Sequence, residues 1–173
     1  MRLLVIQHDA DKGLGLLEAP LRQAGFELDT RLAGRDRVGI DDHLGVVALP
    51  GLADPTDNTT AVTGTRATLR DALHRDLPTL GICLGAELLA QAAGASARPC
   101  RPEYGYRPVT LAAAAATDPL LKDLPSKFDA FHAHAFATDL PQHATALAHS
   151  DHALQAYRLG NAIVHAILSG PGA

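Results

Sequence analysis

The feature that most limits how this chain can fold is a series of short, nearly apolar runs separated by segments with helical spacing. Four runs fit strands, at residues 3–7, 26–32, 44–49 and 78–82. Three segments fit helices, at residues 14–24, 59–75 and 84–93, the second capped by Asn58 or Thr59. Because the runs 3–7 and 44–49 are almost continuously apolar, we expect those strands to be buried on both faces of a parallel sheet.

The second half of the chain changes character and is rich in strands. Short strand-like runs occur at residues 106–111, 128–134, 145–148, 153–159 and 162–168, and only residues 119–124 have a helical pattern. The chain therefore predicts an α/β fold, with a mostly parallel central sheet flanked by helices and an antiparallel extension. Function in such sheets lies at the carboxyl ends of the strands, so the loops after residues 7, 49 and 82 are the candidates.

Size, charge and cysteine content exclude several classes of protein. A length of 173 residues suits a single domain spanning residues 1–173. The net charge of -4 argues against a nucleic-acid-binding protein, which needs a basic face. No apolar run approaches the length of a membrane span, so we expect no membrane partner. Two cysteines are too few for a disulfide framework, which favours the reducing cytoplasm.

The motif that carries chemistry is Gly81-Ile82-Cys83-Leu84-Gly85, at an expected strand-to-helix junction. Two glycines flanking a cysteine form a nucleophile elbow, a turn too tight for its neighbours to carry side chains. The following helix is expected to lower the thiol pKa, and the N–H of Leu84 would face a developing oxyanion. The alternative is a buried structural cysteine beside a glycine-rich turn.

Residues 80–90, which contain this motif, resemble the nucleophile segment of class I (triad-type) glutamine amidotransferases, in particular the stand-alone GMP-synthase-like branch. Four further segments agree with that branch in order, at residues 1–8, 46–51, 102–109 and 131–136. The resemblance implies a Cys83 thiolate that attacks a glutamine or γ-glutamyl amide, assisted by a late-strand histidine. It also implies an oxyanion hole formed by the N–H groups of Gly51 and Leu84, and no cofactor.

The sequence departs from the family pattern at four places. The oxyanion loop has Pro50 before Gly51 where the family has a second glycine, and proline supplies no N–H. Glu87 replaces a substrate-contacting glutamine, and alanines flank His134 in the pocket strand. The closing His-Pro-Glu is absent, and we expect the chain to lack the helix that normally follows it. Glu87 and His134 are nevertheless the expected substrate-binding residues.

Two histidines compete for the role of base. His165 stands 82 residues after Cys83, close to the family's separation, and is the preferred base; His134 is the alternative, and a site without a competent base also stays open. Glu87 lies one helical turn after Cys83, so its carboxylate would raise the thiol pKa. His132 and His134 share a strand face, but no third ligand has suitable local spacing, so we expect no metal.

Three functions remain open. The first is a cysteine enzyme that either supplies ammonia from glutamine to a separate synthase or simply hydrolyses a γ-glutamyl compound, and the second is a catalytically impaired relative that binds a partner. A member of the related intracellular-protease-like superfamily is the third, although Leu84 stands where that group often has histidine. The strand at residues 162–168 would leave an apolar face for another subunit, which predicts a homodimer or a hetero-complex.

Overall fold

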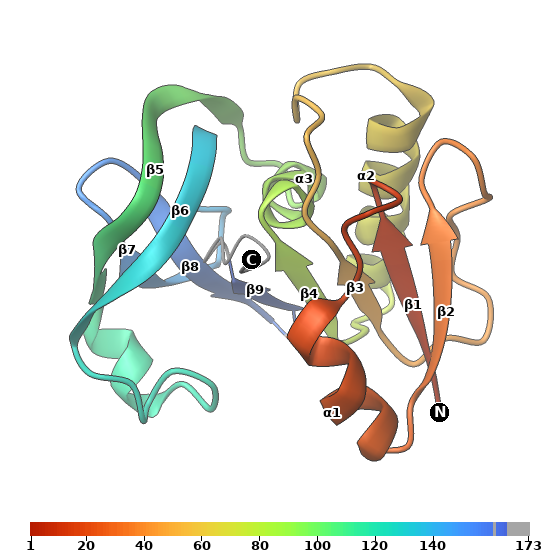
Figure 1. Cartoon of the computed structure of the whole chain (residues 1–173), viewed down its shortest axis with the longest axis horizontal. Helices are drawn as coiled ribbons and strands as arrows, with labels where there is room; N and C mark the ends of the chain where they lie inside the picture. The colour runs from red at the N-terminus through yellow and green to blue at the C-terminus, as the bar shows by residue number, and fades with distance from the viewer. Residues whose placement is uncertain (161, 166–173) are drawn as a thin grey trace.

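The computed structural model describes residues 1–160 and the backbone of residues 162–165. Within this part, one sheet has the strand order β2-β1-β3-β4-β9-β8-β7-β5-β6 (Figure 1). Its parallel strands are β1 (Arg2–Gln7), β2 (Glu27–Leu32), β3 (Val46–Ala48), β4 (Thr79–Ile82) and β9 (Ala162–His165). The antiparallel strands are β5 (Ala97–Leu111), β6 (Lys127–Thr138), β7 (Thr145–His149) and β8 (Leu154–Leu159). The predicted α/β fold with an antiparallel extension is confirmed.

Helices cover both faces of the parallel strands. One face packs against α2 (Thr60–His74) and α3 (Leu84–Ala92), and β1 contributes Leu4 and Ile6 to this core. Val5, which lies between Leu4 and Ile6 in β1, points to the other face of the sheet. There it belongs to a second core cluster with Leu14, beside η1 (Gly15–Leu17) and α1 (Glu18–Gln23). Figure 1 shows α1 well apart from α2 and α3. This burial on both faces explains why β1 is continuously apolar in sequence.

The local sequence pattern predicted the ends of the main helices well, but it predicted one short helix that does not form. Thr59 caps α2, since its side-chain oxygen accepts a hydrogen bond from the Val62 N–H. The expected helix at residues 119–124 is wrong: these residues form turns, and the nearby helical element is η2 (Ala113–Thr117), a short 3₁₀ helix. The Asp118 carboxylate accepts the N–H groups of Leu120 and Leu121, so the chain turns there and does not propagate a helix.

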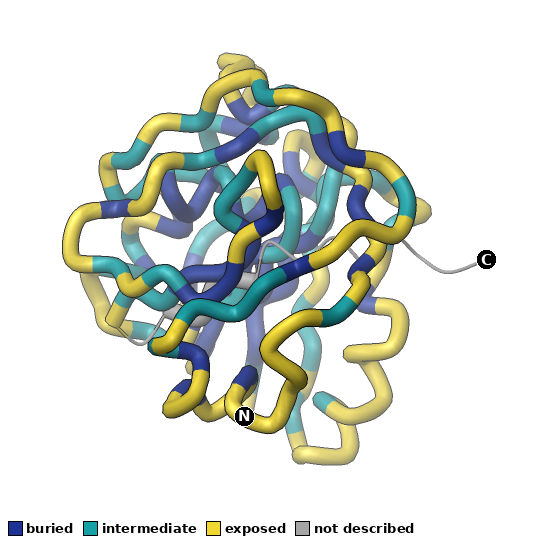
Figure 2. Tube along the Cα trace, turned by 90° about the vertical axis from the view of Figure 1, so that its left-hand side faces the viewer, coloured by how far each residue is buried: buried dark blue, intermediate teal, exposed yellow. Residues whose placement is uncertain are grey.

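Two long strands, β5 and β6, pair antiparallel and form an arm at one edge of the sheet (Figure 1). Buried residues gather in the interior strands, and exposed residues follow the outer turns (Figure 2). Strand β9 lies between β4 and β8, where the parallel and antiparallel strands of the sheet meet, so it is not an edge strand. Residues 166–168 of the expected last strand lie outside the described residues. Among the described helices, none is long and apolar enough to cross a membrane.

Candidate active site

Cys83 occupies the strained turn that the sequence predicts, between the end of β4 and the start of α3. Its backbone has φ 54° and ψ -119°, a conformation unfavourable for a residue with a side chain. A Cβ on Gly81 would lie 2.8 Å from the Gly85 carbonyl oxygen, and a Cβ on Gly85 would collide with the Ala48 carbonyl. The glycines on both sides of Cys83 are therefore required by close backbone approach, as expected for a nucleophile elbow.

Two backbone N–H groups meet at the Cys83 sulfur. Leu84 contributes the first N–H of α3, and Gly51 contributes an N–H from the loop after β3; both hydrogen bonds favour the thiolate. These are the two groups that the sequence analysis assigns to the oxyanion hole. A Cβ on Gly51 would lie 2.7 Å from both His8 Cβ and Leu84 Cδ2, so only glycine allows this loop to approach.

The loop that carries Gly51 is held by residues that follow β1. His8 Nδ1 lies 3.1 Å from the Leu49 carbonyl oxygen, and Asp9 accepts the Leu52 N–H at 3.0 Å. Burial lowers the pKa of His8, which keeps its imidazole neutral. His8 and Asp9 therefore position the loop. The carboxyl ends of β1, β3 and β4 converge as the sheet topology predicts.

A small pocket brings together Cys83, Glu87 and His134, three of the residues singled out from the sequence. Phe136 and Gln155 also line it. Cys83 packs against the apolar core, but it is only partly buried and lines this pocket. The pocket places the candidate nucleophile and the two expected substrate-binding side chains in one space.

The pKa of the Cys83 thiol is higher than expected for a cysteine at a helix N-terminus. Burial and the negative charge of Glu87 raise its pKa to about 12, and the hydrogen bonds from Leu84 and Gly51 only partly oppose this. The expected lowering of the pKa by the Leu84 N–H is present but outweighed, so the net shift is upward, and the expected effect of Glu87 is also present. Glu87 is perturbed as well: burial, with a smaller contribution from Asp54, raises its pKa to about 7. Glu87 thus changes its charge near neutral pH.

The backbone of His165 lies on the strand next to the nucleophile. In the parallel pair of β4 and β9, His165 is opposite Ile82, the residue before Cys83. This register is consistent with His165 as the base, but its side chain lies outside the described residues, and the assignment stays a prediction. His134 comes from β6 on the opposite wall of the pocket.

The partners of His134 are not evident from the sequence. Glu103 lies directly opposite His134 in the β5–β6 pair, and its carboxylate oxygen is 3.2 Å from His134 Nε2. Ser150 donates its hydroxyl to Glu103, and Gln155 Nε2 lies 3.2 Å from His134 Nε2. The long antiparallel pairing of β5 and β6, which the sequence did not reveal, places Glu103 opposite His134, and β8 with the turn before it supplies Gln155 and Ser150.

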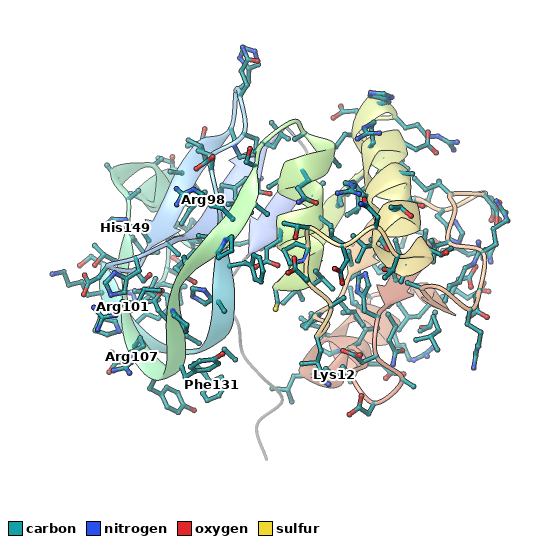
Figure 3. The ribbon with its side chains drawn as sticks, turned by 90° about the horizontal axis from the view of Figure 1, so that it is seen from above. Lys12, Arg98, Arg101, Arg107, Phe131 and His149 are labelled. Carbon is teal, nitrogen blue, oxygen red and sulfur yellow. The ribbon has the colours of Figure 1, made fainter. Side chains whose placement is uncertain are left out.

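Glu103 is the exception among the charged residues of β5. The other charged side chains, Arg98, Arg101 and Arg107, are exposed and lie around the outside of the arm, far from Lys12 near β1 (Figure 3). Glu103 is buried, with 6% of its surface exposed, beside two buried histidines. Burial lowers the pKa of both His132 and His134, and the neighbouring Glu103 opposes this change. The arm thus carries a polar cluster inside and basic residues outside.

Comparison with known proteins adds to this geometry. Residues 17–164 match the family model described as glutamine amidotransferase class-I. Over 60 residues, 34% of this chain, the sequence is 43% identical to the GMP synthase [glutamine-hydrolyzing] of Elusimicrobium minutum (strain Pei191). That match spans only 11% of the relative's length.

Solved structures share the fold. A glutamine amidotransferase from Thermotoga maritima has a TM-score of 0.86 at 24% identity, with 95% of this chain and 74% of the other covered. A putative GMP synthase subunit from Thermoplasma acidophilum has a TM-score of 0.72 at 21% identity, with 95% and 82% covered. At these identities the structural matches establish the architecture.

Proposed function

Because the chain belongs to the class I glutamine amidotransferase family, whose GMP-synthase-like branch it resembles, we propose that it uses Cys83 to cleave a glutamine or γ-glutamyl amide. The observation that carries this proposal is the meeting of two backbone N–H groups, from Gly51 and Leu84, at a strained and pocket-facing cysteine. A structural cysteine would need neither the strain nor the donors.

The proposed reaction has two stages. The Cys83 thiolate attacks the carbonyl carbon of the side-chain amide, and the oxyanion accepts the N–H groups of Gly51 and Leu84. The His165 imidazole, which accepts the Cys83 thiol proton as the thiolate forms, gives that proton to the leaving nitrogen as the C–N bond breaks; for glutamine this releases ammonia and leaves a γ-glutamyl thioester. Water, deprotonated by the same imidazole, then hydrolyses the thioester to glutamate and regenerates the thiol.

Glu87 and His134 are the proposed substrate-binding residues on the pocket walls, His134 through the surface of its ring because both ring nitrogens face protein partners. The Glu87 carboxylate can accept hydrogen bonds from the α-ammonium group of glutamine, and it lies in the pocket with Cys83. It cannot donate to the substrate α-carboxylate unless it is protonated. Since its pKa is raised to about 7, the protonated form is accessible near neutral pH.

The high thiol pKa favours an enzyme that is slow in isolation. Because burial and the charge of Glu87 raise the thiol pKa to about 12, little of the Cys83 thiolate forms near neutral pH. We therefore propose that a separate synthase receives the ammonia and that its docking changes the surroundings of Cys83 and Glu87. The same observation supports the second candidate, a catalytically impaired relative that acts as a binding or regulatory partner, of a synthase or of a second copy of the chain.

The test is release of ammonia and glutamate from L-glutamine or a γ-glutamyl amide, measured at high protein concentration. We expect slow turnover that disappears in Cys83→Ala and persists in the matched control Cys100→Ser. Turnover that survives in Cys83→Ala would contradict the proposed nucleophile. Absence of turnover in the wild-type protein, together with a Cys83 that no glutamine-like electrophile modifies, would favour the binding protein.

A further inference from the structure

Three potential metal ligands meet inside the β5–β6 arm. His132 and His134 alternate with exposed residues along β6 and so project from its buried face, and Glu103 projects from the same face of β5. All three are at least nine-tenths buried, with 6% of Glu103, 0% of His132 and 7% of His134 exposed. A carboxylate and two imidazoles taken so far out of water need partners that satisfy their lone pairs.

The hydrogen bonds around this cluster orient lone pairs toward its centre. His134 Nδ1 lies 3.1 Å from the Phe136 carbonyl oxygen, an acceptor, so Nδ1 carries the proton and Nε2 presents its lone pair. That lone pair faces the Gln155 amide nitrogen at 3.2 Å, which can donate to it, and also the Glu103 carboxylate, another acceptor, at 3.2 Å. Two acceptors this close need a proton or a cation between them. On the outer side of the cluster, His132 Nε2 is buried without a hydrogen-bond partner, so the protein alone does not complete the network.

The three inward atoms have the spacing of ligands around a single ion. His134 Nε2 lies 3.2 Å from Glu103 Oε2 and 3.4 Å from His132 Nδ1, and His132 Nδ1 lies 3.8 Å from Glu103 Oε2. A tetrahedral zinc site with bonds of about 2.0–2.2 Å has ligand–ligand edges of about 3.3–3.6 Å. The cluster therefore needs only small side-chain movements to close around an ion.

We propose that Glu103, His132 and His134 bind one divalent transition-metal cation of the zinc type. Two imidazole nitrogens and one carboxylate oxygen suit Zn²⁺, Co²⁺ or Fe²⁺ better than Mg²⁺ or Ca²⁺, which prefer oxygen ligands. Three protein ligands leave a fourth position open. The Gln155 side chain lies beside His134 and can supply its amide oxygen there after rotation of the amide.

Neighbouring residues already orient these ligands as they would around a bound metal. The Phe136 carbonyl fixes the tautomer of His134, and the Ser150 hydroxyl donates to Glu103 Oε2 at 2.6 Å. Such partners hold the rings and carboxylates of metal sites in place. Of the three ligands, His134 also lines the pocket that contains Cys83.

The experiment is titration of the metal-free full-length protein with Zn²⁺ in competition with a chromophoric chelator. A second titration with Co²⁺ reports four-coordinate geometry through its visible d–d bands. We expect one equivalent of Zn²⁺ to bind to the wild-type protein. The variants Glu103→Gln and His132→Gln should weaken this binding by at least about 100-fold, and Ser150→Ala should weaken it by about 10- to 100-fold.

Matched controls separate this site from other metal-binding groups. His149→Gln changes an exposed histidine on β7, and Cys83→Ala and Cys100→Ser remove the two thiols; all three should retain the wild-type affinity. Circular dichroism and melting curves identify variants that fold, and Ser150→Ala decides the matter if the ligand variants do not. The proposal is overturned if no stoichiometric metal binds, if Ser150→Ala and every folded ligand variant bind as the wild type does, or if only the cysteine variants lose binding. A proton would then be what joins Glu103 to the histidines.

Discussion

Replacing Glu87 with glutamine should make Cys83 more reactive. Glu87 lies one helical turn after Cys83 in α3, shares its pocket, and raises the pKa of the thiol through its negative charge. Glutamine has nearly the same shape and no charge, so Glu87→Gln removes the repulsion and leaves the packing almost unchanged. Burial of the thiol remains, and its pKa should therefore fall without reaching the value of a free cysteine.

The size of the effect follows from the charge separation. Side chains one helical turn apart have Cβ atoms about 5–6 Å apart, and two unit charges at that distance interact by roughly 3 kcal/mol at an effective dielectric constant of about 20. Both side chains are only partly buried, which reduces this interaction, so we expect the thiol pKa to fall by about one to two units. Since a less basic thiolate is a weaker nucleophile, alkylation should accelerate by only about 3- to 10-fold.

The assay is the rate of Cys83 alkylation by iodoacetamide as a function of pH, followed by mass spectrometry of the Cys83 peptide. The ratio of Glu87→Gln to wild type should be largest above pH 8. It should approach one below pH 6, because Glu87, with a pKa of about 7, is then protonated in the wild type. Glu18→Gln, on the exposed helix α1, is the matched control and should alkylate like the wild type. Equal rates for Glu87→Gln and wild type at pH 9 would refute the reasoning.

Three further predictions concern stability and the base. The pKa of Glu87 is about 7 in the folded protein and 4.5 in its unperturbed state, so the folded state binds more protons between these two pH values. The unfolding free energy should therefore fall by up to about 3 kcal/mol as pH rises from 4.5 to 7. Urea titrations should show that Glu87→Gln removes this fall. Gly85→Ala should lower the melting temperature strongly or prevent folding, because the new Cβ meets the Ala48 carbonyl; a melting curve like that of the wild type would contradict the close approach. His165→Ala should slow alkylation of the nucleophile at pH 7 and His134→Ala should slow it less, whereas the reverse order would assign the base to His134.

The sequence was most informative where structure depends on local geometry. Gly81 and Gly85 mark the elbow because no Cβ fits beside the strained turn, and Thr59 marks the start of α2 because its hydroxyl replaces a missing backbone partner. Alternation along β6 correctly placed His132 and His134 on one face. Each of these features needs only residues that are close in the chain or a steric rule that holds in any fold.

Features that depend on distant pairing or on burial could not be predicted in this way. Glu103 meets His134 only through the register of the β5–β6 pair, which contains an irregularity between Pro99 and Glu103 that no local pattern indicates. The direction of the Cys83 pKa depends on how deeply the thiol is buried, which outweighs the two N–H groups that the motif does predict. The turns at residues 119–124 likewise depend on how Asp118 is held, by an ion pair with Arg158.

The central claim, that Cys83 is a nucleophile in a formed glutamine site, is tested most directly by a glutamine-analogue diazo-ketone. The protein is incubated with the reagent at pH 8, and the modified peptide is identified by mass spectrometry. We expect one label on Cys83, slowed by excess L-glutamine, lost in Cys83→Ala and unchanged in Cys100→Ser. Labelling of Cys100 in place of Cys83, or no labelling at any pH from 6 to 9, would contradict it.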